Sequence, residues 1–301
     1  MTEIRPRRSV LYMPGSNARA LEKARDIPAD ALILDLEDAV APDAKEMARA
    51  QVCAAVAAGG YGRREMVIRV NGVESPWFAA DLAAAAEAKP DAILIPKISD
   101  AETLVMIGGQ LSGLWADSAI RIWAMIETPL AILDAERIAR AARDPATRLS
   151  CFVMGTNDLA KESRARFTPG RAAMLPWLAT AILAARAHGI DVLDGVYNAL
   201  KDEAGFIAEC KQGRDLGFDG KTLIHPAQVA PANAAFAPDA DEIARARAVI
   251  AAFELPENAG KGAIQLDGRM VERMHAEMGR RIVALAEAIE AGEPGARAAA
   301  E

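Results

Sequence analysis

The sequence predicts an α/β chain that forms a (β/α)₈ TIM barrel followed by a C-terminal lid or helical extension. Eight short apolar runs recur between residues 9 and 224, each followed by a segment long enough for a helix. The runs show little polar alternation, which is typical of parallel strands that are buried on both faces. Eight such units within about 250 residues fit a closed barrel. A doubly wound open sheet is the alternative arrangement of the same pattern.

The expected strands are rich in Val, Ile and Leu and end at turn-forming or charged residues. They cover residues 9–13, 31–36, 66–71, 92–97, 120–126, 149–154, 191–196 and 220–224. Ser16 or Asn17 can cap the first connecting helix, and the second begins near Pro42 and runs through Ala58. The helical pattern is least clear after the third strand. We assign residues 1–255 to the barrel catalytic domain.

Residues 256–301 are expected to form a C-terminal segment that acts as a lid or docks on a neighbouring subunit. A helix over residues 239–253, ended by Pro256, precedes this segment. A glycine-punctuated loop over residues 259–268 follows. Apolar side chains then recur at helical spacing, at Met270, Met274, Met278, Ile282, Leu285 and Ile289.

Composition limits the class of protein. With 52% hydrophobic residues the chain can bury a core, and it contains neither a signal-peptide pattern nor an apolar run of membrane-spanning length. Three scattered cysteines and three scattered histidines fit a reducing compartment and argue against a zinc cluster. A net charge of -7 argues against nucleic acid as a partner. We therefore expect a cytoplasmic protein that binds neither nucleic acid nor membranes.

Two carboxylates follow neighbouring expected strands, and they define the candidate site. Glu127 comes directly after the fifth strand, and Asp158 follows the sixth within the segment 154–160. Residues just past the ends of parallel strands point into the mouth of the sheet, where α/β enzymes bind ligands. Two carboxylates there can share one Mg²⁺ ion and leave its other positions to water and substrate. Gly155 lets the backbone approach a ligand and expose N–H groups to an oxyanion.

Other polar and charged residues lie at strand ends. They are Asp35, Glu37 and Asp38 after the second strand, Arg69 and Asn71 in the third, Lys97 after the fourth, and Arg8 before the first. A set of salt bridges that holds the barrel loops is the alternative explanation, with Asp38, Lys97 and Arg8 as its members. The sequence has no Gly-x-Ser-x-Gly motif and no dinucleotide fingerprint. Lys97 as a Schiff-base lysine is a further alternative.

With these residues in place, the sequence resembles the citrate lyase beta-subunit-like group of the HpcH/HpaI aldolase superfamily. The matching segments are RSVLYMPG (8–15), LDLEDAV (34–40), IRVN (68–71), IPK (95–97), IET (126–128), GTNDLA (155–160), KTLIHP (221–226) and KGAIQLDGRMVE (261–272). They occur in order along nearly the whole chain.

The resemblance implies a Mg²⁺-dependent carbon–carbon lyase. Members act on 3-hydroxyacyl-CoA thioesters such as malyl-CoA or citramalyl-CoA and give a 2-keto acid and an acyl-CoA. They usually assemble as homotrimers or hexamers, in which the C-terminal segment, here residues 256–301, covers the active site of a neighbouring subunit. The implied metal ligands are Glu127 and Asp158, and Arg69 would bind the carboxylate of the keto-acid half. The remaining roles are substrate contacts for Arg8, Gly155, Thr156 and Asn157, and support of metal-bound water or neighbouring groups for Asp35, Glu37 and Asp38.

The chain departs from this group at Glu272. In well-known lyase members the C-terminal motif ends in an aspartate that is proposed as the acid/base acting across the subunit interface. Glutamate keeps the carboxylate but moves it by about one ångström or more, enough to affect a tight reacting geometry. Glu272 is therefore expected to be the acid/base for a different substrate, or to mark a changed reaction such as thioester hydrolysis. A solvated residue at a helix start is the other possibility.

The carbon–carbon lyase is thus the leading hypothesis. The alternatives are a malyl-CoA thioesterase, an aldolase that acts on free hydroxy-keto acids, and a citrate lyase beta subunit that works on a carrier-bound citryl thioester within a complex.

Overall fold

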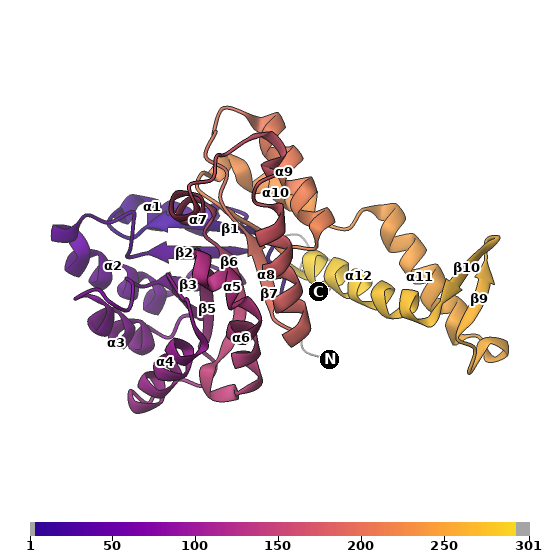
Figure 1. Ribbon diagram of the computed structural model, residues 1–301, viewed down its shortest axis with the longest axis horizontal. Helices are drawn as coiled ribbons and strands as arrows, with labels where there is room; N and C mark the ends of the chain where they lie inside the picture. Colours follow the sequence, from indigo (N-terminus) through magenta and orange to yellow (C-terminus); the bar gives the residue numbers. More distant parts are fainter. Residues whose placement is uncertain (1–3, 293–301) are drawn as a thin grey trace. The chain divides into compact units, whose positions relative to one another are not determined.

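The computed structural model describes residues 4–292, in which eight parallel strands close into a barrel (Figure 1). The strands are β1 (Ser9–Pro14), β2 (Ala31–Asp35), β3 (Glu65–Arg69), β4 (Ala92–Ile95), β5 (Arg121–Ile126), β6 (Leu149–Met154), β7 (Asp191–Asp194) and β8 (Gly220–Leu223). β1 pairs with β2 on one side and with β8 on the other, where Val10 is the partner of Thr222. This closure confirms the predicted barrel and excludes the doubly wound open sheet.

Helices surround the barrel strands (Figure 1). They are α1 (Ala18–Lys23), α2 (Lys45–Ala58), α3 (Phe78–Ala88), α4 (Ala101–Gly113), α5 (Pro129–Leu133), α6 (Ala135–Arg140), α7 (Thr156–Ser163), α8 (Leu175–His188), α9 (Glu203–Leu216) and α10 (Val229–Phe236). Short polar side chains fix several starts, since Asn17, Asp100 and Thr128 each accept a hydrogen bond from a first-turn N–H group. α3 follows the third strand, where the sequence pattern was weakest.

Side chains fill the barrel interior, so it is a packed core. Val10, Ile33, Val67 and Trp123 belong to this interior cluster, all fully buried. Arg7 lies at the end of the barrel where the strands begin and forms ion pairs with Glu65 and Asp191. Its guanidinium carbon lies 5.1 Å from the ring centroid of Trp123. Charge and packing therefore close this end, which leaves the opposite end, where the strands finish, for a site. We call that end the mouth.

The chain divides into two compact units, one of which is the barrel, Arg7–Phe236. The other contains Met1–Pro6 and Ala237–Glu301, of which the structure describes residues 4–6 and 237–292. The predicted barrel domain includes the helix α11 (Ala240–Glu254), and the predicted lid segment begins at residue 256. In the structure Val249 and Phe253 of α11 pack with Ile264 and Val271 in the second unit. Residues 293–301 of the expected lid segment lie outside the described residues.

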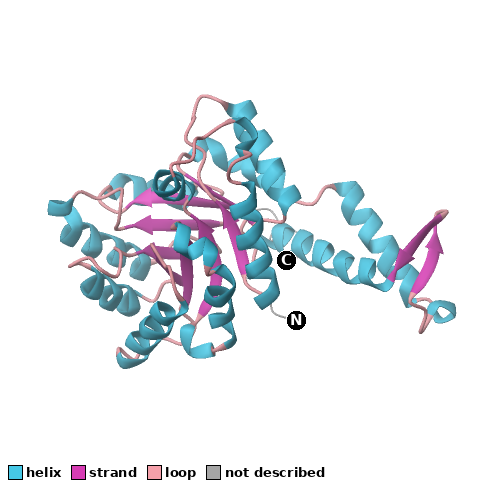
Figure 2. Ribbon diagram, viewed as in Figure 1, coloured by secondary structure: helices cyan, strands magenta, loops and turns pink. Residues whose placement is uncertain are grey.

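The expected loop over residues 259–268 is wrong in part, because residues 263–272 form an antiparallel hairpin (Figure 2). β9 (Ala263–Leu266) pairs with β10 (Arg269–Glu272), and α12 (Arg273–Gly292) follows directly. Asp267 and Gly268 form the two-residue turn, with φ of 51° and 74°. An Asp-Gly turn with positive φ at both residues is the favoured hairpin connection. Met270 therefore lies in β10 and not in the terminal helix. None of the helices described between residues 4 and 292 has the length and apolar character to cross a membrane.

Candidate active site

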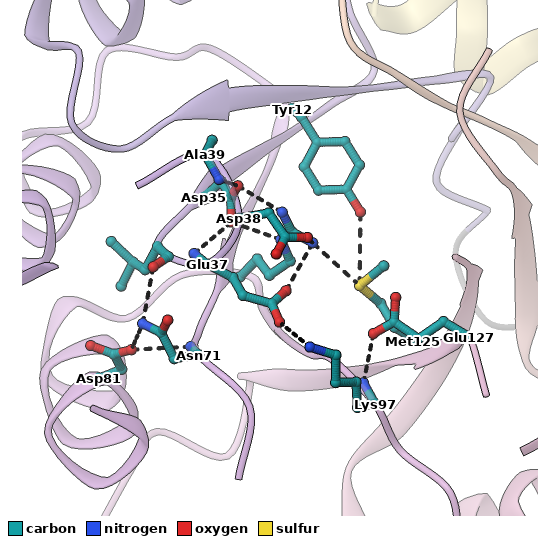
Figure 3. A network of polar contacts seen from close by, with 12 residues as sticks. Tyr12, Asp35, Glu37, Asp38, Ala39, Asn71, Asp81, Lys97, Met125 and Glu127 are labelled. Carbon is teal, nitrogen blue, oxygen red and sulfur yellow. Dashed lines mark hydrogen bonds and ion pairs between the residues drawn. The ribbon is translucent and has the colours of Figure 1, made fainter. Parts of the chain in front are cut away.

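Asp35 and Arg69 form the base of the mouth. They are the last residues of β2 and β3 and are partners in the strand register. Arg69 donates from Nε and Nη2 to the two carboxylate oxygens of Asp35, both at 2.7 Å. Asp35 also accepts from the backbone N–H groups of Glu37 and Ala39 (Figure 3). A two-point charged contact of this kind fixes the plane of the guanidinium group and leaves Nη1 to face the mouth.

Glu37 connects Arg69 to Lys97. Its carboxylate lies 2.9 Å from Arg69 Nη1 and 3.4 Å from Lys97 Nζ. Asp38, which is mostly exposed, approaches the same Nη1 at 3.4 Å. Burial raises the pKa of Glu37 above its usual value, although Arg69 opposes this. Burial lowers the pKa of Lys97, but the carboxylates of Glu37 and Glu127 outweigh this and raise it overall. A protonated ammonium group is not a nucleophile, which argues against Lys97 as a Schiff-base lysine.

Glu127 lies directly after β5 and is 1% exposed. Its Oε1 accepts a hydrogen bond of 2.8 Å from the backbone N–H of Lys97 (Figure 3). Lys97 adopts a left-handed φ of 56°, which is uncommon for a residue with a side chain and turns this N–H toward the carboxylate. Burial raises the pKa of Glu127 to about 8, and the negative charges of Glu37 and Asp158 add to this rise.

Asp158 lies in the first turn of α7 and is partly exposed. Among residues 4–292 no hydrogen bond or ion pair engages its carboxylate, and no hydrogen bond reaches Glu127 Oε2. Gly155 brings the two segments together, because a Cβ at this position would lie 2.4 Å from Cβ and Oε2 of Glu127. The Gly155 N–H, however, donates to the carbonyl of Ile126. The expectation that this N–H faces an oxyanion is therefore wrong, and the glycine serves close approach.

The acidic groups at the mouth outnumber the basic ones and fit a hard cation. The acidic groups are Asp35, Glu37, Asp38, Glu127 and Asp158, and the basic groups are Arg69 and Lys97. A cation between Glu127 and Asp158 would remove the repulsion that raises the pKa of Glu127. The described part of the chain contains no group of three or more Asp, Glu, His or Cys side chains that could hold a metal ion. Two carboxylates with open positions match the way Mg²⁺ binds, with water and substrate as its other ligands.

The structure brings some of the other predicted substrate residues to this end of the barrel. The Thr156 hydroxyl is buried, has no hydrogen-bond partner within the described residues, and packs against Gly195 at the end of β7. The exposed Asn157 exchanges amide hydrogen bonds with Asn198, at 2.7 and 3.4 Å, which ties α7 to the segment after β7.

The structure does not bring Arg8 to the mouth. It precedes β1, and its Nε and Nη2 each lie 2.9 Å from the carboxylate of Asp30. As a residue that begins a strand, it belongs to the opposite end of the barrel. Glu272 lies in the other compact unit as an exposed residue at the end of β10, and its N–H donates to Nδ1 of His275. Its predicted acid/base role stays a prediction.

Sequence reasoning missed two buried cations that hold the ends of strands. Lys45 Nζ donates to the carbonyls of Leu36 and Glu37 and to Oδ1 of Asn71. Lys221, which is fully buried in β8, forms ion pairs with Asp194 and Glu209. For Lys221 the signal available in the sequence was a lysine within an apolar strand, where an unpaired charge is costly. Lys45 begins the helix α2, and no local pattern marks it.

A model of the HpcH/HpaI aldolase/citrate lyase family matches residues 8–226. The chain belongs to this family. Among its relatives, a (3S)-malyl-CoA thioesterase of Cereibacter sphaeroides is 52% identical over 286 residues, which cover 95% of this chain and 96% of that protein. The citrate lyase subunit beta of Escherichia coli is 34% identical over 288 residues, 94% of both chains.

Crystal structures from the same family have the same fold. The CitE protein of Mycobacterium tuberculosis in complex with magnesium, acetoacetate and coenzyme A has a TM-score of 0.73 at 26% identity, and the match covers 94% of this chain and 98% of that one. The citrate lyase beta subunit of the same organism, complexed with oxaloacetate and magnesium, gives 0.65 at 26% identity, over 79% of this chain and 100% of that one. The Mg²⁺ expected from the sequence agrees with these complexes. Members of the HpcH/HpaI aldolase/citrate lyase family act on CoA esters as lyases or thioesterases.

Proposed function

We propose that this chain is a Mg²⁺-dependent enzyme that hydrolyses the thioester of malyl-CoA or a similar 3-hydroxy dicarboxylic acid. The observation that carries the proposal is the 52% identity with a (3S)-malyl-CoA thioesterase over nearly the full chain, against 34% with citrate lyase subunit beta. On this support we rank hydrolysis before the carbon–carbon lyase, which is the leading hypothesis from the sequence alone. The lyase is the second candidate and is supported by the citrate lyase relatives.

The two strand-end carboxylates have the chemistry to hold the metal. We assign Glu127 and Asp158 as protein ligands of Mg²⁺, because they combine free oxygens with mutual repulsion. Bound Mg²⁺ supplies a Lewis acid that polarises substrate oxygens and stabilises developing negative charge. Arg69, held flat by Asp35, would bind the carboxylate of the substrate's acid half through Nη1. The first turn of α7 leaves N–H groups without intrahelical partners, and these favour an anionic oxygen.

Glu272 is the proposed acid/base. In hydrolysis its carboxylate would take the proton of the water whose oxygen bonds to the thioester carbonyl carbon. The carbon–sulfur bond then breaks, and CoA leaves as a thiol after protonation. In the lyase reaction the same group would protonate the enolate that remains on the acyl-CoA. We propose that Glu272 acts on the site of a neighbouring subunit in a homotrimer or hexamer.

Product analysis tests the proposal directly. Purified protein is given Mg²⁺ with malyl-CoA and then with citramalyl-CoA, and free thiol and 2-keto acid are followed separately. Hydrolysis predicts free thiol without keto acid, and Asp158→Ala or EDTA should abolish it. Keto acid without free thiol would instead establish the lyase. Neither product from either ester would refute both reactions on malyl-type substrates.

A further inference from the structure

Tyr12 places a phenol hydroxyl in the barrel mouth beside the groups assigned to substrate and metal. It lies on the inward face of β1, two residues after Val10, and its partly buried ring packs against the interior cluster. The guanidinium carbon of Arg69 lies 4.9 Å from the ring centroid. The hydroxyl points toward Met125, with Glu127 next to it (Figure 3).

Two hydrogen-bond donors meet at a poor acceptor. The Tyr12 hydroxyl lies 4.0 Å from Met125 Sδ, and Arg69 Nη1 lies 3.8 Å from the same sulfur. Within residues 4–292 no nitrogen or oxygen atom is a hydrogen-bond partner of this hydroxyl. A thioether sulfur accepts hydrogen bonds only weakly, and most sheltered hydroxyl groups have a stronger partner. The geometry therefore provides a donor without a matching acceptor, next to a cationic group.

The electrostatic surroundings keep this hydroxyl in its donor form. Burial raises the pKa of Tyr12 above the usual phenol value, and the carboxylates of Asp35, Glu127 and Glu37 add to the rise while Arg69 opposes it. The phenol is therefore protonated at neutral pH and can donate. An anionic ligand oxygen that reaches Arg69 Nη1 would lie within the space that both donors face.

We infer that Tyr12 is a further substrate-contacting residue, whose hydroxyl donates a hydrogen bond to the carboxylate of the acid half that Arg69 binds. The inference rests on the proposed function and deepens it. It gives the site a second donor that favours acids with a carboxylate at this position over acyl groups that lack one. A site with a dedicated hydrogen-bond donor discriminates strongly, because the donor is left unpaired by the wrong substrate.

The test compares Tyr12→Phe with Tyr61→Phe. Tyr12→Phe removes the hydroxyl but keeps the ring that supports Arg69. Tyr61 is a matched control, since its buried hydroxyl donates to the carbonyl of Leu21 on the helical side of the barrel. Calorimetry measures the binding of (S)-malate in the presence of Mg²⁺, and separately the binding of Mg²⁺ alone. Turnover of malyl-CoA gives KM and kcat.

We expect Tyr12→Phe to raise the Kd of malate at least about tenfold, as for a lost hydrogen bond to a charged group, with unchanged Mg²⁺ binding. Tyr61→Phe should change neither. Unchanged malate affinity in Tyr12→Phe would refute the inference and leave the proposed function intact. Loss of Mg²⁺ binding in Tyr12→Phe would show a structural role and also refute it. If the unsubstituted protein binds neither malate nor malyl-CoA with Mg²⁺, the proposed function fails, and the Tyr12 assignment fails with it.

Discussion

The charged form of Glu127 lowers the stability of the metal-free protein, but it is the form that would bind a cation. Its pKa is raised from 4.5 to about 8 by burial, with the negative charges of Glu37 and Asp158 adding to the rise. Between these two values the folded protein binds a proton that the unfolded chain has released. The free energy of unfolding of the metal-free protein therefore falls as the pH rises through this window. A bound cation would reverse this trend, because it prefers the charged carboxylate.

The variant Glu127→Gln should separate the two effects of this carboxylate, on stability and on cation binding. In EDTA at pH 9 we expect the variant to melt a few degrees above the unsubstituted protein, because it no longer buries a charge. At pH 6, where Glu127 is protonated, the two should melt together. Mg²⁺ should raise the melting temperature of the unsubstituted protein at pH 9 and leave that of the variant unchanged. Thermal unfolding at both pH values measures this, with the exposed Glu162→Gln as control. Stabilisation of the variant by Mg²⁺ would rule out Glu127 as a ligand.

The metal site should require a glycine at position 155, because there is no room for a side chain beside Glu127. In Gly155→Ala the new Cβ would collide with Glu127 at 2.4 Å, so the carboxylate has to move. We expect a loss of stability of about 1–3 kcal/mol and at least about a tenfold weaker affinity for Mg²⁺. Gly109→Ala is the control, because that glycine lies in α4 with no atom within 4 Å of the added carbon. Equal Mg²⁺ affinity in both variants would contradict this role.

At the scale of elements, a buried charge network joins the last two strands to Arg171, which lies in the segment before α8. Asp194 at the end of β7 pairs with Lys221 of β8 at 2.9 Å and with Arg171 at 2.7 Å. Thr222 also donates to the carbonyl of Asp194, and Lys221 Nζ donates to that of Gly195. The network fixes Gly195, against which Thr156 of α7 packs. It therefore supports the mouth from outside the barrel.

Asp194→Ala should destabilise the protein in a pH-dependent way. Burial alone would raise the pKa of Asp194, but Lys221 and Arg171 lower it below its usual 3.8. The stability it contributes is thus present above the unfolded-state value and is lost as the pH falls through the folded one. We expect a loss of about 3–5 kcal/mol at pH 7 that shrinks below about pH 4. Urea unfolding across this range measures it, with the exposed Asp215→Ala as control. A pH-independent difference would contradict the network.

The strands were predictable because a barrel strand buried on both faces leaves a continuous apolar run, as in Ala31–Asp35 and Leu149–Met154. The positions of Glu127 and Asp158 near the ends of β5 and β6 were predictable for a related reason, since a carboxylate close after such a run has no structural role in the core. The hairpin at Asp267–Gly268 was hidden because its flanking strands are only four residues long. Such short runs barely show a period.

The remaining differences arise from contacts between distant parts of the chain. Arg8 pairs with Asp30, a partner that no local pattern identifies. The Gly155 N–H is used by the pairing of β6 with β5, which depends on register. In the sequence, Tyr12 does not differ from an ordinary aromatic residue in a strand. Only the folded structure, in which β1, β3 and β5 converge, shows that its hydroxyl lies beside Arg69 and Met125.

For the whole molecule, the charge at the mouth predicts that substrate binding depends on the cation. The proposed substrate is an anionic acid, and the chain carries a net charge of -7 with an excess of carboxylates at the mouth. Arg69 is already engaged by Asp35 and Glu37. An anion therefore gains little from this site until a divalent cation offsets the nearby carboxylates. Binding of the acid half should accordingly require Mg²⁺, and calorimetry with malate in EDTA should detect no binding.

The proposed acid/base and the proposed metal ligands lie in different compact units, and we propose that neighbouring subunits share each site. If Glu272 serves a neighbouring subunit, Asp158→Asn and Glu272→Gln should each be inactive as pure proteins for different reasons. When the two variants are co-expressed and assemble at random, a site can combine an intact Asp158 from one chain with an intact Glu272 from the next. Activity should then recover to about one quarter of the unsubstituted level in a cyclic trimer.

The control is a mixture of Asp158→Asn with Glu127→Gln, which places both lesions in the same metal site and should stay inactive. Thiol release from malyl-CoA is the measurement, and size-exclusion chromatography establishes that mixed oligomers form. No recovery in the Asp158→Asn and Glu272→Gln mixture would mean that each chain completes its own site. Full activity in Glu272→Gln alone would instead mean that Glu272 takes no part in the reaction, because only a residue outside the reaction can be replaced without loss.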